Sequence, residues 1–349
     1  MGYSRLEGAL IKLKEIAEKA NVSISTVSRI INNQGNFSDD TRRKVLEIAN
    51  DYLKPGITPS RMVGISYSIA VFVPDVNDFF DNDPSSSADL NDLKEEFESY
   101  GHQFHMATHT ADLTPSSSAY RLLNEKKIDA AVIFDPFVGD SLVEELMNRG
   151  IPYLITNGRN YDAAQNYIDY DNRKGAYDVI HYLYGLGHRR IGMIAGPSEH
   201  LVNENRLRGC RDAFLQLGMP WNESNVLMGA FDPAHGHQAV KKMLAEQPDI
   251  TAIFAFNDII AFGAMKGLAE LKLRVPKDVS LIGFDDLKLS EFMMPPLTTV
   301  RRFRYDISQL IVKMLTELIT NKNISEVNIS LKTELIERES CAKVTVREE

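Results

Sequence analysis

The segment Leu13–Asn32, which reads LKEIAEKANVSISTVSRIIN, constrains this chain most because its pattern predicts two short helices joined by a tight turn. Its first half repeats apolar residues at the i, i+3, i+4, i+7 spacing of one packed helix face, at Leu13, Ile16, Ala17 and Ala20. The pattern breaks at Asn21, which tolerates left-handed backbone, and at Ser23, a common helix cap.

Two further helices are predicted to complete this head. The second helix packs inward through Val27, Ile30 and Ile31. The third begins near Ser38 and repeats the helical spacing at Val45, Ile48, Ala49 and Tyr52. Three helices around one small core form a domain that can place one helix in the major groove of DNA.

An ordinary three-helix bundle without a role in nucleic-acid binding would show the same periodicity. The exposed face of the second helix favours the DNA-binding interpretation, since it begins Ser-Ile-Ser-Thr at 23–26 and continues with Ser28 and Arg29. A merely solvated helix face would more readily carry Glu and Lys. We therefore interpret the segment as a helix-turn-helix.

Charge is distributed unevenly along the chain. The formal net charge is −9, which by itself argues against a phosphate-rich partner. Residues 1–62, however, carry 10 Lys and Arg against 7 Asp and Glu, whereas the remaining residues carry 29 against 41. A mildly basic head on an acidic body fits a protein whose head alone contacts the DNA backbone.

Length and composition limit the remaining classes. With 349 residues, the chain is long enough for two or three domains. Cys210 and Cys341 have no partner at metal-ligand spacing, which suits a reducing cytosol. We find no apolar signal segment at the N-terminus and no run of about 18 apolar residues. These features predict a cytoplasmic protein without a membrane partner.

The predicted elements divide the chain into a DNA-binding domain over 1–55, a linker over 56–68 and a core over 69–349. Within the core, predicted strands and helices alternate in two series that meet near Tyr167–Asp169, as in parallel sheets covered by helices on both faces. We expect two doubly wound parallel-sheet lobes. The first lobe covers about 69–167 plus 299–326, and the second covers about 168–298 plus 327–344. Ligands in such folds bind at the carboxyl ends of the strands, here in a cleft between the lobes.

Enzyme and metal signatures are sparse. The sequence has no GxxxxGK[ST] phosphate loop, no GxGxxG after a strand, no GxSxG and no HExxH. His102, His105 and His109 follow an HxxHxxxH spacing, but a strand would scatter them onto different faces and no carboxylate or Cys pairs with them. We expect surface histidines there, and we predict no catalytic residues, no metal and no cofactor.

Polar residues stand at the ends of several predicted strands. Asn157, Asn257 and Asp285 follow three strands, and Arg206 lies near the start of a helix. If these positions converge on the cleft, their donors and acceptors suit the hydroxyls of a sugar. Aromatic residues that could stack on its apolar face are Phe79, Tyr170 and Phe231. Some of the polar residues could instead be helix caps, and Asp258 is the one we expect to be a cap.

The whole chain, from about Leu10 to Arg338, resembles the LacI/GalR family of bacterial transcription repressors. The motifs that carry the resemblance occur in matching order: VSISTVSRIIN at 22–32, LGHRRIGMIAGP at 186–197, NDIIAFGAM at 257–265, VPKDVSLIGFDD at 275–286 and PPLTTV at 295–300. The resemblance implies an all-α helix-turn-helix head and an α/β core like that of periplasmic binding proteins. It also implies a cytoplasmic, nucleoid-associated homodimer bound to palindromic double-stranded operator DNA.

The resemblance also implies roles for individual residues. Ile24, Ser25 and Arg29 would read base edges, with Arg29 suited to guanine. The other DNA-binding residues, most of them on the phosphate backbone, would be Leu13, Ser23, Thr26, Ser28 and Asn32. The implied effector residues are Asn157, Arg206, Asn257, Asp285 and Arg302, although Arg302 could instead be a solvated loop residue. Phe79 and Phe80 stand in the loop over the effector, where Asp78 replaces the usual Pro.

The linker departs from the family pattern. Relatives usually carry an Ala-Arg-Ser-Leu-like hinge helix whose Leu wedges into the minor groove and kinks the DNA. Here 58–62 reads TPSRM, which puts Arg61 or Met62 at the wedge. We expect weaker kinking, or Met62 as the wedge. Because 343–349 carries no leucine heptad, we expect a dimer and not a tetramer.

Together these features predict a repressor of sugar-utilisation genes whose operator binding is controlled by a small molecule, a sugar, in the cleft. Corepression by a purine, a phosphosugar or a protein partner is the main alternative. A solute-binding protein for transport would need an export signal and would have no use for the head. A sugar-modifying enzyme would need a base–nucleophile pair or a phosphate loop.

Overall fold

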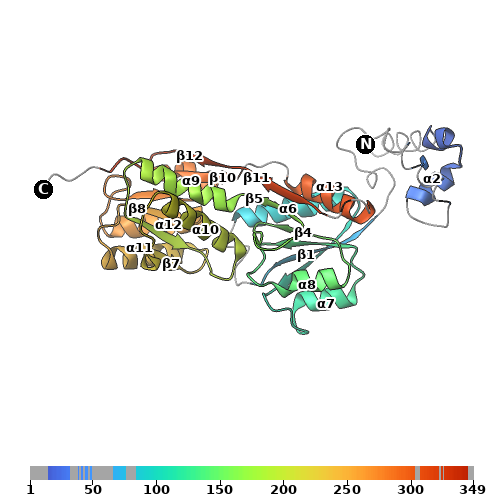
Figure 1. Ribbon diagram of the computed structural model, residues 1–349, viewed down its shortest axis with the longest axis horizontal. Coiled ribbons are helices and arrows are strands. Elements are labelled where there is room, and N and C mark those ends of the chain that lie inside the picture. The colour runs from blue at the N-terminus through green and yellow to red at the C-terminus, as the bar shows by residue number, and fades with distance from the viewer. Residues whose placement is uncertain are drawn as a thin grey trace.

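A computed structural model describes residues 15–31, 38, 41, 44–45, 48, 66–75, 84–302, 307–321, 324 and 326–344. In the head, residues 15–20 are helical and α2 spans Ile24–Ile31 (Figure 1). The predicted core is confirmed for the buried residues Ile16, Ala17, Ala20, Val27, Ile30 and Val45, with Val22 and Ile48 packed against them. Leu13, Ala49 and Tyr52 lie outside the described residues.

Six parallel strands form the sheet of the first lobe, in the order β11-β5-β4-β3-β1-β2 (Figure 1). They are Ser68–Pro74 (β1), Gln103–His109 (β2), Ala130–Phe134 (β3), Tyr153–Thr156 (β4), Tyr167–Tyr170 (β5) and Asn328–Leu331 (β11). The central strands β1, β3 and β4 are almost entirely buried. They are covered on both faces, which explains their continuous apolar sequences.

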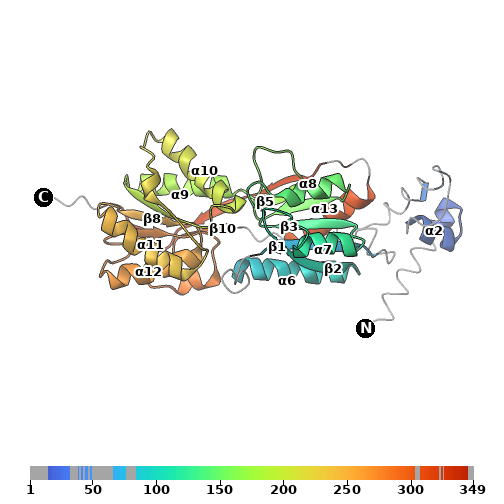
Figure 2. The same ribbon diagram turned by 90° about the horizontal axis from the view of Figure 1, so that it is seen from below.

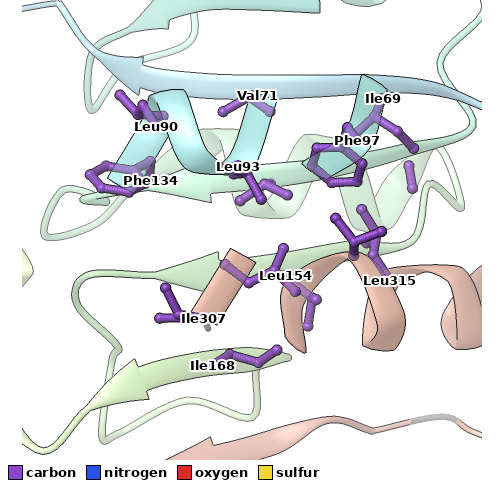
Figure 3. Packing of buried hydrophobic residues seen from close by; sticks show 14 of the residues in the cluster. Ile69, Val71, Leu90, Leu93, Phe97, Phe134, Leu154, Ile168, Ile307 and Leu315 are labelled. Carbon is purple, nitrogen blue, oxygen red and sulfur yellow. The ribbon is translucent and has the colours of Figure 1, made fainter. Parts of the chain in front are cut away.

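Two pairs of helices cover this sheet (Figure 2). On one face lie α6 (Pro84–Ser99) and α13 (Ile307–Thr320), whose side chains interdigitate with those of the strands. Figure 3 shows Leu93 and Phe97 of α6, Leu315 of α13 and Leu154 of β4 in this core. On the other face, α7 (Ser118–Glu125) and α8 (Ser141–Asn148) bury a second apolar cluster.

The second lobe repeats this plan with a parallel four-stranded sheet, in the order β7-β6-β8-β9. Its strands are Ile191–Ala195 (β6), Val226–Met228 (β7), Ala252–Ala255 (β8) and Ser280–Ile282 (β9). Helices α9 (Asn172–Gly185) and α10 (Leu201–Gln216) cover one face. Helices α11 (Pro233–Glu246) and α12 (Asp258–Glu270) cover the other. The two doubly wound lobes are therefore confirmed.

The chain passes between the lobes after Tyr170, after Arg302 and after Leu331. β10 (Thr299–Arg302) and β12 (Thr333–Ile336) pair as antiparallel strands beside the second lobe. The crossings thus lie a few residues later than the boundaries expected at 167/168, 298/299 and 326/327. The reason is that β5 and β11 complete the first sheet, and β10 pairs with β12, before the chain crosses.

The expectation that the three histidines near β2 are surface residues is wrong for two of them. His102 and His109 are buried, and His105 is half-buried. His109 Nδ1 lies 3.3 Å from Asp140 Oδ2, so a carboxylate does accompany it, from a loop distant in sequence. Among the described residues, no group of three His, Cys, Asp or Glu side chains could hold a metal ion. No helix in the described part of the chain is long and apolar enough to cross a membrane.

Candidate DNA-reading helix and effector cleft

The turn before α2 is organised by the hydroxyl of Ser23. Asn21 enters it with a left-handed backbone, at φ 58°. Ser23 Oγ accepts a hydrogen bond from the Thr26 amide at 3.0 Å, and the hydroxyls of Ser25 and Thr26 lie 2.7 and 2.8 Å from it. Ser23 therefore caps the helix. Ser25 is exposed at the helix start, whereas Val27 is buried on the packed face.

The remaining predicted DNA and loop positions are described less fully. Leu13, Asn32, Arg61 and Met62 lie outside the described residues, as do Phe79 and Phe80. For Ile24, Ser28 and Arg29, the structure describes only the backbone of α2.

Where the two lobes meet, Arg206 of α10 is buried and its guanidinium is held on several sides. Its Nε donates to Asn172 Oδ1 at 3.0 Å, and its Nη2 donates to Asp285 Oδ1 at 3.2 Å. Its Nη1 donates to the carbonyl oxygen of Phe256. The guanidinium carbon lies 3.9 Å from the centre of the Phe284 ring. One side chain thus joins the carboxyl ends of β8 and β9 to α9 and α10.

Arg302 reaches the same carboxylate and joins it to the first lobe. Its Nε lies 3.3 Å from Asp285 Oδ1, and its Nη1 donates to Asn157 Oδ1 at 3.2 Å. The same Nη1 lies 3.6 Å from Asp89 Oδ2, and the guanidinium carbon lies 5.2 Å from the ring centre of Tyr170. Arg302 is buried, so the alternative of a solvated loop arginine is wrong. We call Asp89, Asn157, Tyr170, Arg206, Asp285 and Arg302 the arginine cluster.

Left-handed backbone recurs at the carboxyl ends of strands where the two lobes meet. Asn157 has φ 60° after β4, Asp285 and Asp286 have φ 108° and 52° after β9, and Asp135 has φ 53° after β3. Asn and Asp tolerate this conformation better than other residues with a Cβ, yet it still costs energy. Such strain is concentrated at binding sites, where the surrounding structure maintains it. This edge of both sheets is therefore a candidate site.

Two predicted effector residues have other contacts. Asn257 Oδ1 accepts from the Ile260 amide at 2.7 Å, so Asn257 is the N-cap of α12. The prediction that Asp258 is the cap is therefore wrong. Asp258 is the first helical residue and turns inward, where it accepts from the Leu287 amide and the Ser290 hydroxyl at 2.8 and 2.6 Å. Phe231 packs on Gly196, where a Cβ would lie 2.1 Å from its ring.

Two buried carboxylates near the cleft hold protons more tightly than usual. Burial raises the pKa of Asp169 to about 7, although nearby Arg159 opposes the rise. Burial also raises the pKa of Asp258 to about 7, and the negative charge of Asp285 adds to the effect. Protonation of these two groups is therefore sensitive to pH near neutrality.

A second contact between the lobes was missed by sequence reasoning. Phe137 and His200 form an isolated antiparallel β-bridge between the loop after β3 and the loop before α10. His200 Nδ1 lies 3.0 Å from Asp135 Oδ2, and both side chains are buried. We call residues 135–138 and 199–201 the loop bridge. Asp135 follows its strand just as Asn157 does, so the strand-end rule could have found it, but no sequence signal marked His200.

Family comparisons agree with this geometry. The model of bacterial regulatory proteins of the lacI family matches residues 12–52, and that of the periplasmic binding protein-like domain matches residues 180–341. The HTH-type transcriptional regulator DegA of Bacillus subtilis is 31% identical over 291 residues, which cover 82% of this chain and 85% of DegA. The chain belongs to the lacI family.

Other lacI-family members match along nearly the full length. The HTH-type transcriptional repressor CytR of Escherichia coli is 30% identical over 333 residues, 94% of this chain and 95% of CytR. The solved complex of the transcriptional regulator CelR with cellobiose has a TM-score of 0.70 and 29% identity, and covers 94% of this chain and 99% of CelR. This lacI-family protein is therefore a DNA-binding transcriptional regulator.

Proposed function

We propose that this regulator is a repressor of sugar-utilisation genes and that a neutral sugar binds in the arginine cluster. The observation that carries the proposal is the meeting of donors and acceptors from both lobes on Asp285 and Arg302. A ligand that exchanges these contacts for its own favours one angle between the lobes. A hundredfold change in operator affinity needs a coupling of about 2.7 kcal/mol, which one ligand's differential contacts can supply. The CelR–cellobiose complex supports a sugar.

Charge pairing favours a neutral ligand over a phosphosugar. Arg206 pairs with Asp285, and Arg302 pairs with both Asp285 and Asp89. A phosphate would have to compete with these carboxylates for the two guanidinium groups. A neutral sugar instead uses mixed donors and acceptors without separating the ion pairs. Corepression by a phosphosugar, a purine or a protein partner is the alternative that the binding experiment below distinguishes.

Proposed roles follow for individual residues. Effector contacts come from Asn157, Arg206, Asp285 and Arg302, with Tyr170, Phe231, Asn257 and the loop residues Phe79 and Phe80 around them. In the head, Ile24, Ser25 and Arg29 read bases. Leu13, Ser23, Thr26, Ser28 and Asn32 complete the DNA contact, and Arg61 or Met62 acts at the hinge. If Met62 is the wedge, Met62→Ala reduces operator bending, and unchanged bending removes Met62 from that role.

We further propose a homodimer on a palindromic operator. Supporting it are three large apolar side chains exposed within one short segment at and after η2 (Lys288–Phe292): Leu289, Phe292 and Met294, which are 54%, 67% and 91% exposed. Equilibrium sedimentation is expected to give a dimer, and a stable tetramer would refute this proposal. Because Phe292→Ser removes one of these exposed apolar side chains, it should weaken the dimer.

The decisive experiment is fluorescence anisotropy of the full-length protein with DNA from its own promoter region. It is repeated with cellobiose and other neutral sugars, with phosphosugars and with purines. Release of DNA by a neutral sugar supports the proposal, whereas tighter binding with a phosphosugar or purine would establish corepression. The absence of salt-sensitive, sequence-specific binding would refute DNA binding.

We propose that the protein binds its effector without turning it over, in the cytoplasm at the nucleoid. Stoichiometric binding of unchanged sugar, followed by chromatography of the recovered ligand, tests the first part. Recovery of a modified sugar would establish an enzyme instead.

A further inference from the structure

The loop bridge ties the lobes together at a point separate from the arginine cluster. Its two backbone hydrogen bonds run from the Val138 amide to the Glu199 carbonyl at 2.7 Å and from the Leu201 amide to the Pro136 carbonyl at 3.0 Å. Beside them, the Asp135–His200 pair is almost completely buried, with side chains 5% and 2% exposed. The bridge thus combines direct backbone pairing with one ionisable pair.

The Asp135–His200 pair is incompletely satisfied. Within the described part of the chain, Asp135 Oδ1 and His200 Nε2 have no hydrogen-bond partner. The His200 ring lies 4.8 Å from the Phe137 ring and 6.1 Å from the Phe231 ring, and neither ring offers a strong acceptor. A buried polar atom without a partner costs about 1 to 3 kcal/mol, and water would satisfy both atoms if the loops parted. These two unmet hydrogen bonds lower the cost of separating the loops.

We propose that Asp135 and His200 are positioning residues that set how firmly the two lobes are held at the loop bridge, and that the charge on His200 controls this hold. The ion pair attracts the loops only while the imidazole is protonated, whereas the neutral ring retains a single hydrogen bond. In a regulator of the proposed function, a change in how firmly the lobes are held also alters operator binding. Only this consequence rests on the proposed function.

Electrostatics around His200 set the pH range of this effect. Burial lowers the pKa of His200, but the carboxylates of Asp135 and Glu199 raise it more, so the net shift is upward. The attraction between Asp135 and His200 is therefore fully present below the usual histidine pKa of about 6.5. It is lost as pH rises through the raised pKa of His200 in the folded protein.

Other titratable groups lie on the elements packed around the bridge. On the first lobe, His109 lies 5.2 Å from the Phe137 ring and accompanies Asp140. On the second lobe, near Phe231, His235 Nε2 lies 3.0 Å from the Ala195 carbonyl oxygen, and Asp232 caps α11. Variants of His200 itself are therefore needed to assign a pH effect to the bridge.

Hydrogen–deuterium exchange of the full-length protein tests the proposal without any ligand or DNA. The amides of Val138 and Leu201 report on the bridge, because their hydrogen bonds cross between the lobes. The Ile155 amide, bonded to the Asn166 carbonyl within the first lobe, is the internal reference. After correction for intrinsic exchange, we expect protection of the two bridge amides to fall about tenfold from pH 6 to pH 9 in the wild type.

Two variants and one control complete the test. His200→Gln should give weak, pH-independent protection of the bridge amides, and Asp135→Asn should do the same while keeping a residue that tolerates φ 53°. The control His181→Gln replaces a half-buried histidine that contacts Gln216 far from the bridge, and it should behave as the wild type. If both bridge variants retain the wild-type protection and pH dependence, the proposal is wrong. Failure of the proposed function is seen separately, as absent operator binding by the wild type.

Discussion

The two contacts between the lobes are built in opposite ways. In the arginine cluster, two guanidinium groups share the Asp285 carboxylate and also bond to Asn157, Asn172 and a backbone carbonyl. In the loop bridge, a single ion pair leaves one oxygen and one nitrogen without hydrogen bonds. We infer that the cluster, with its many partners, holds its geometry, whereas the bridge, with one ion pair, separates more readily.

This difference suggests that the two contacts have different roles. If the arginine cluster binds the effector as we propose, its many partners select the ligand, because each lost bond leaves a buried charge unpaired. A marginal contact adjusts the equilibrium between lobe arrangements, because a change of about 1.4 kcal/mol shifts it tenfold. The following predictions test whether the two contacts really differ in this way, from the largest expected effect to the smallest.

Removing one charge from the arginine cluster should have the largest effect. We expect Arg302→Met to lower the free energy of unfolding by about 3 to 5 kcal/mol, since it leaves Asp89 and Asn157 facing an apolar side chain. Urea denaturation measures the loss. The matched control is Arg301→Met, because Arg301 is 41% exposed where it pairs with Asp286. That variant should cost less than about 1 kcal/mol. Equal losses of unfolding free energy in Arg302→Met and Arg301→Met would contradict the inference that the buried cluster contributes more than an exposed ion pair.

The buried carboxylate beside the cluster should make stability depend on pH. The folded pKa of Asp169, about 7, lies above its unfolded value, so its proton favours the folded state. The stability it contributes is fully present below the unfolded pKa and is lost as pH rises through about 7. Asp169→Asn retains an oxygen for the Gly158 amide and cannot ionise. As pH rises from 4.5 to 8.5, the free energy of unfolding of the wild type should therefore fall by on the order of 2 kcal/mol relative to that of the variant. A constant difference in denaturation across this range would show that Asp169 does not titrate there.

In the loop bridge, the same kind of change should cost less. We expect Asp135→Asn to lower the free energy of unfolding by about 1 kcal/mol, well below the cost of Arg302→Met. Asp135→Ala should cost about 1 kcal/mol more than Asn, because Ala tolerates φ 53° poorly. Denaturation curves of the two variants separate the charge effect from the backbone effect. A loss in Asp135→Asn as large as that in Arg302→Met would remove the contrast between the contacts.

The smallest effect concerns a residue at the edge of the cleft that does not join the lobes. Asn257→Ala removes the side-chain cap of α12 and should cost about 1 kcal/mol in unfolding free energy. Asn257→Ser, which can still cap, should restore most of it. If Asn257 also contacts the effector, sugar affinity should fall in both variants, which calorimetry would detect.

Sequence reasoning succeeded where a pattern repeats locally. The strands Ala130–Phe134, Tyr153–Thr156 and Ala252–Ala255 are short apolar runs, and this pattern is how a buried parallel strand is recognised in a sequence. Asn157, Arg206 and Asp285 were chosen from their places at strand and helix ends, and the structure brings them together with Arg302.

The failures concern choices that local patterns do not contain. Both Asn257 and Asp258 are good capping residues, and only the donors of Leu287, Ser290 and Thr299, which meet the Asp258 carboxylate in the folded chain, decide which one turns inward. Likewise, His109 is buried beside Asp140, which lies far from it in sequence.

By itself, the sequence determined the two-helix head segment, the alternation of strands and helices, and the family, because periodicity and motifs are properties of neighbouring residues. Only the tertiary structure decided that Arg302 is a buried link between the lobes and that Asp135 meets His200 across them. Both contacts join residues on different elements, and their geometry exists only after two sheets and their crossing strands have packed.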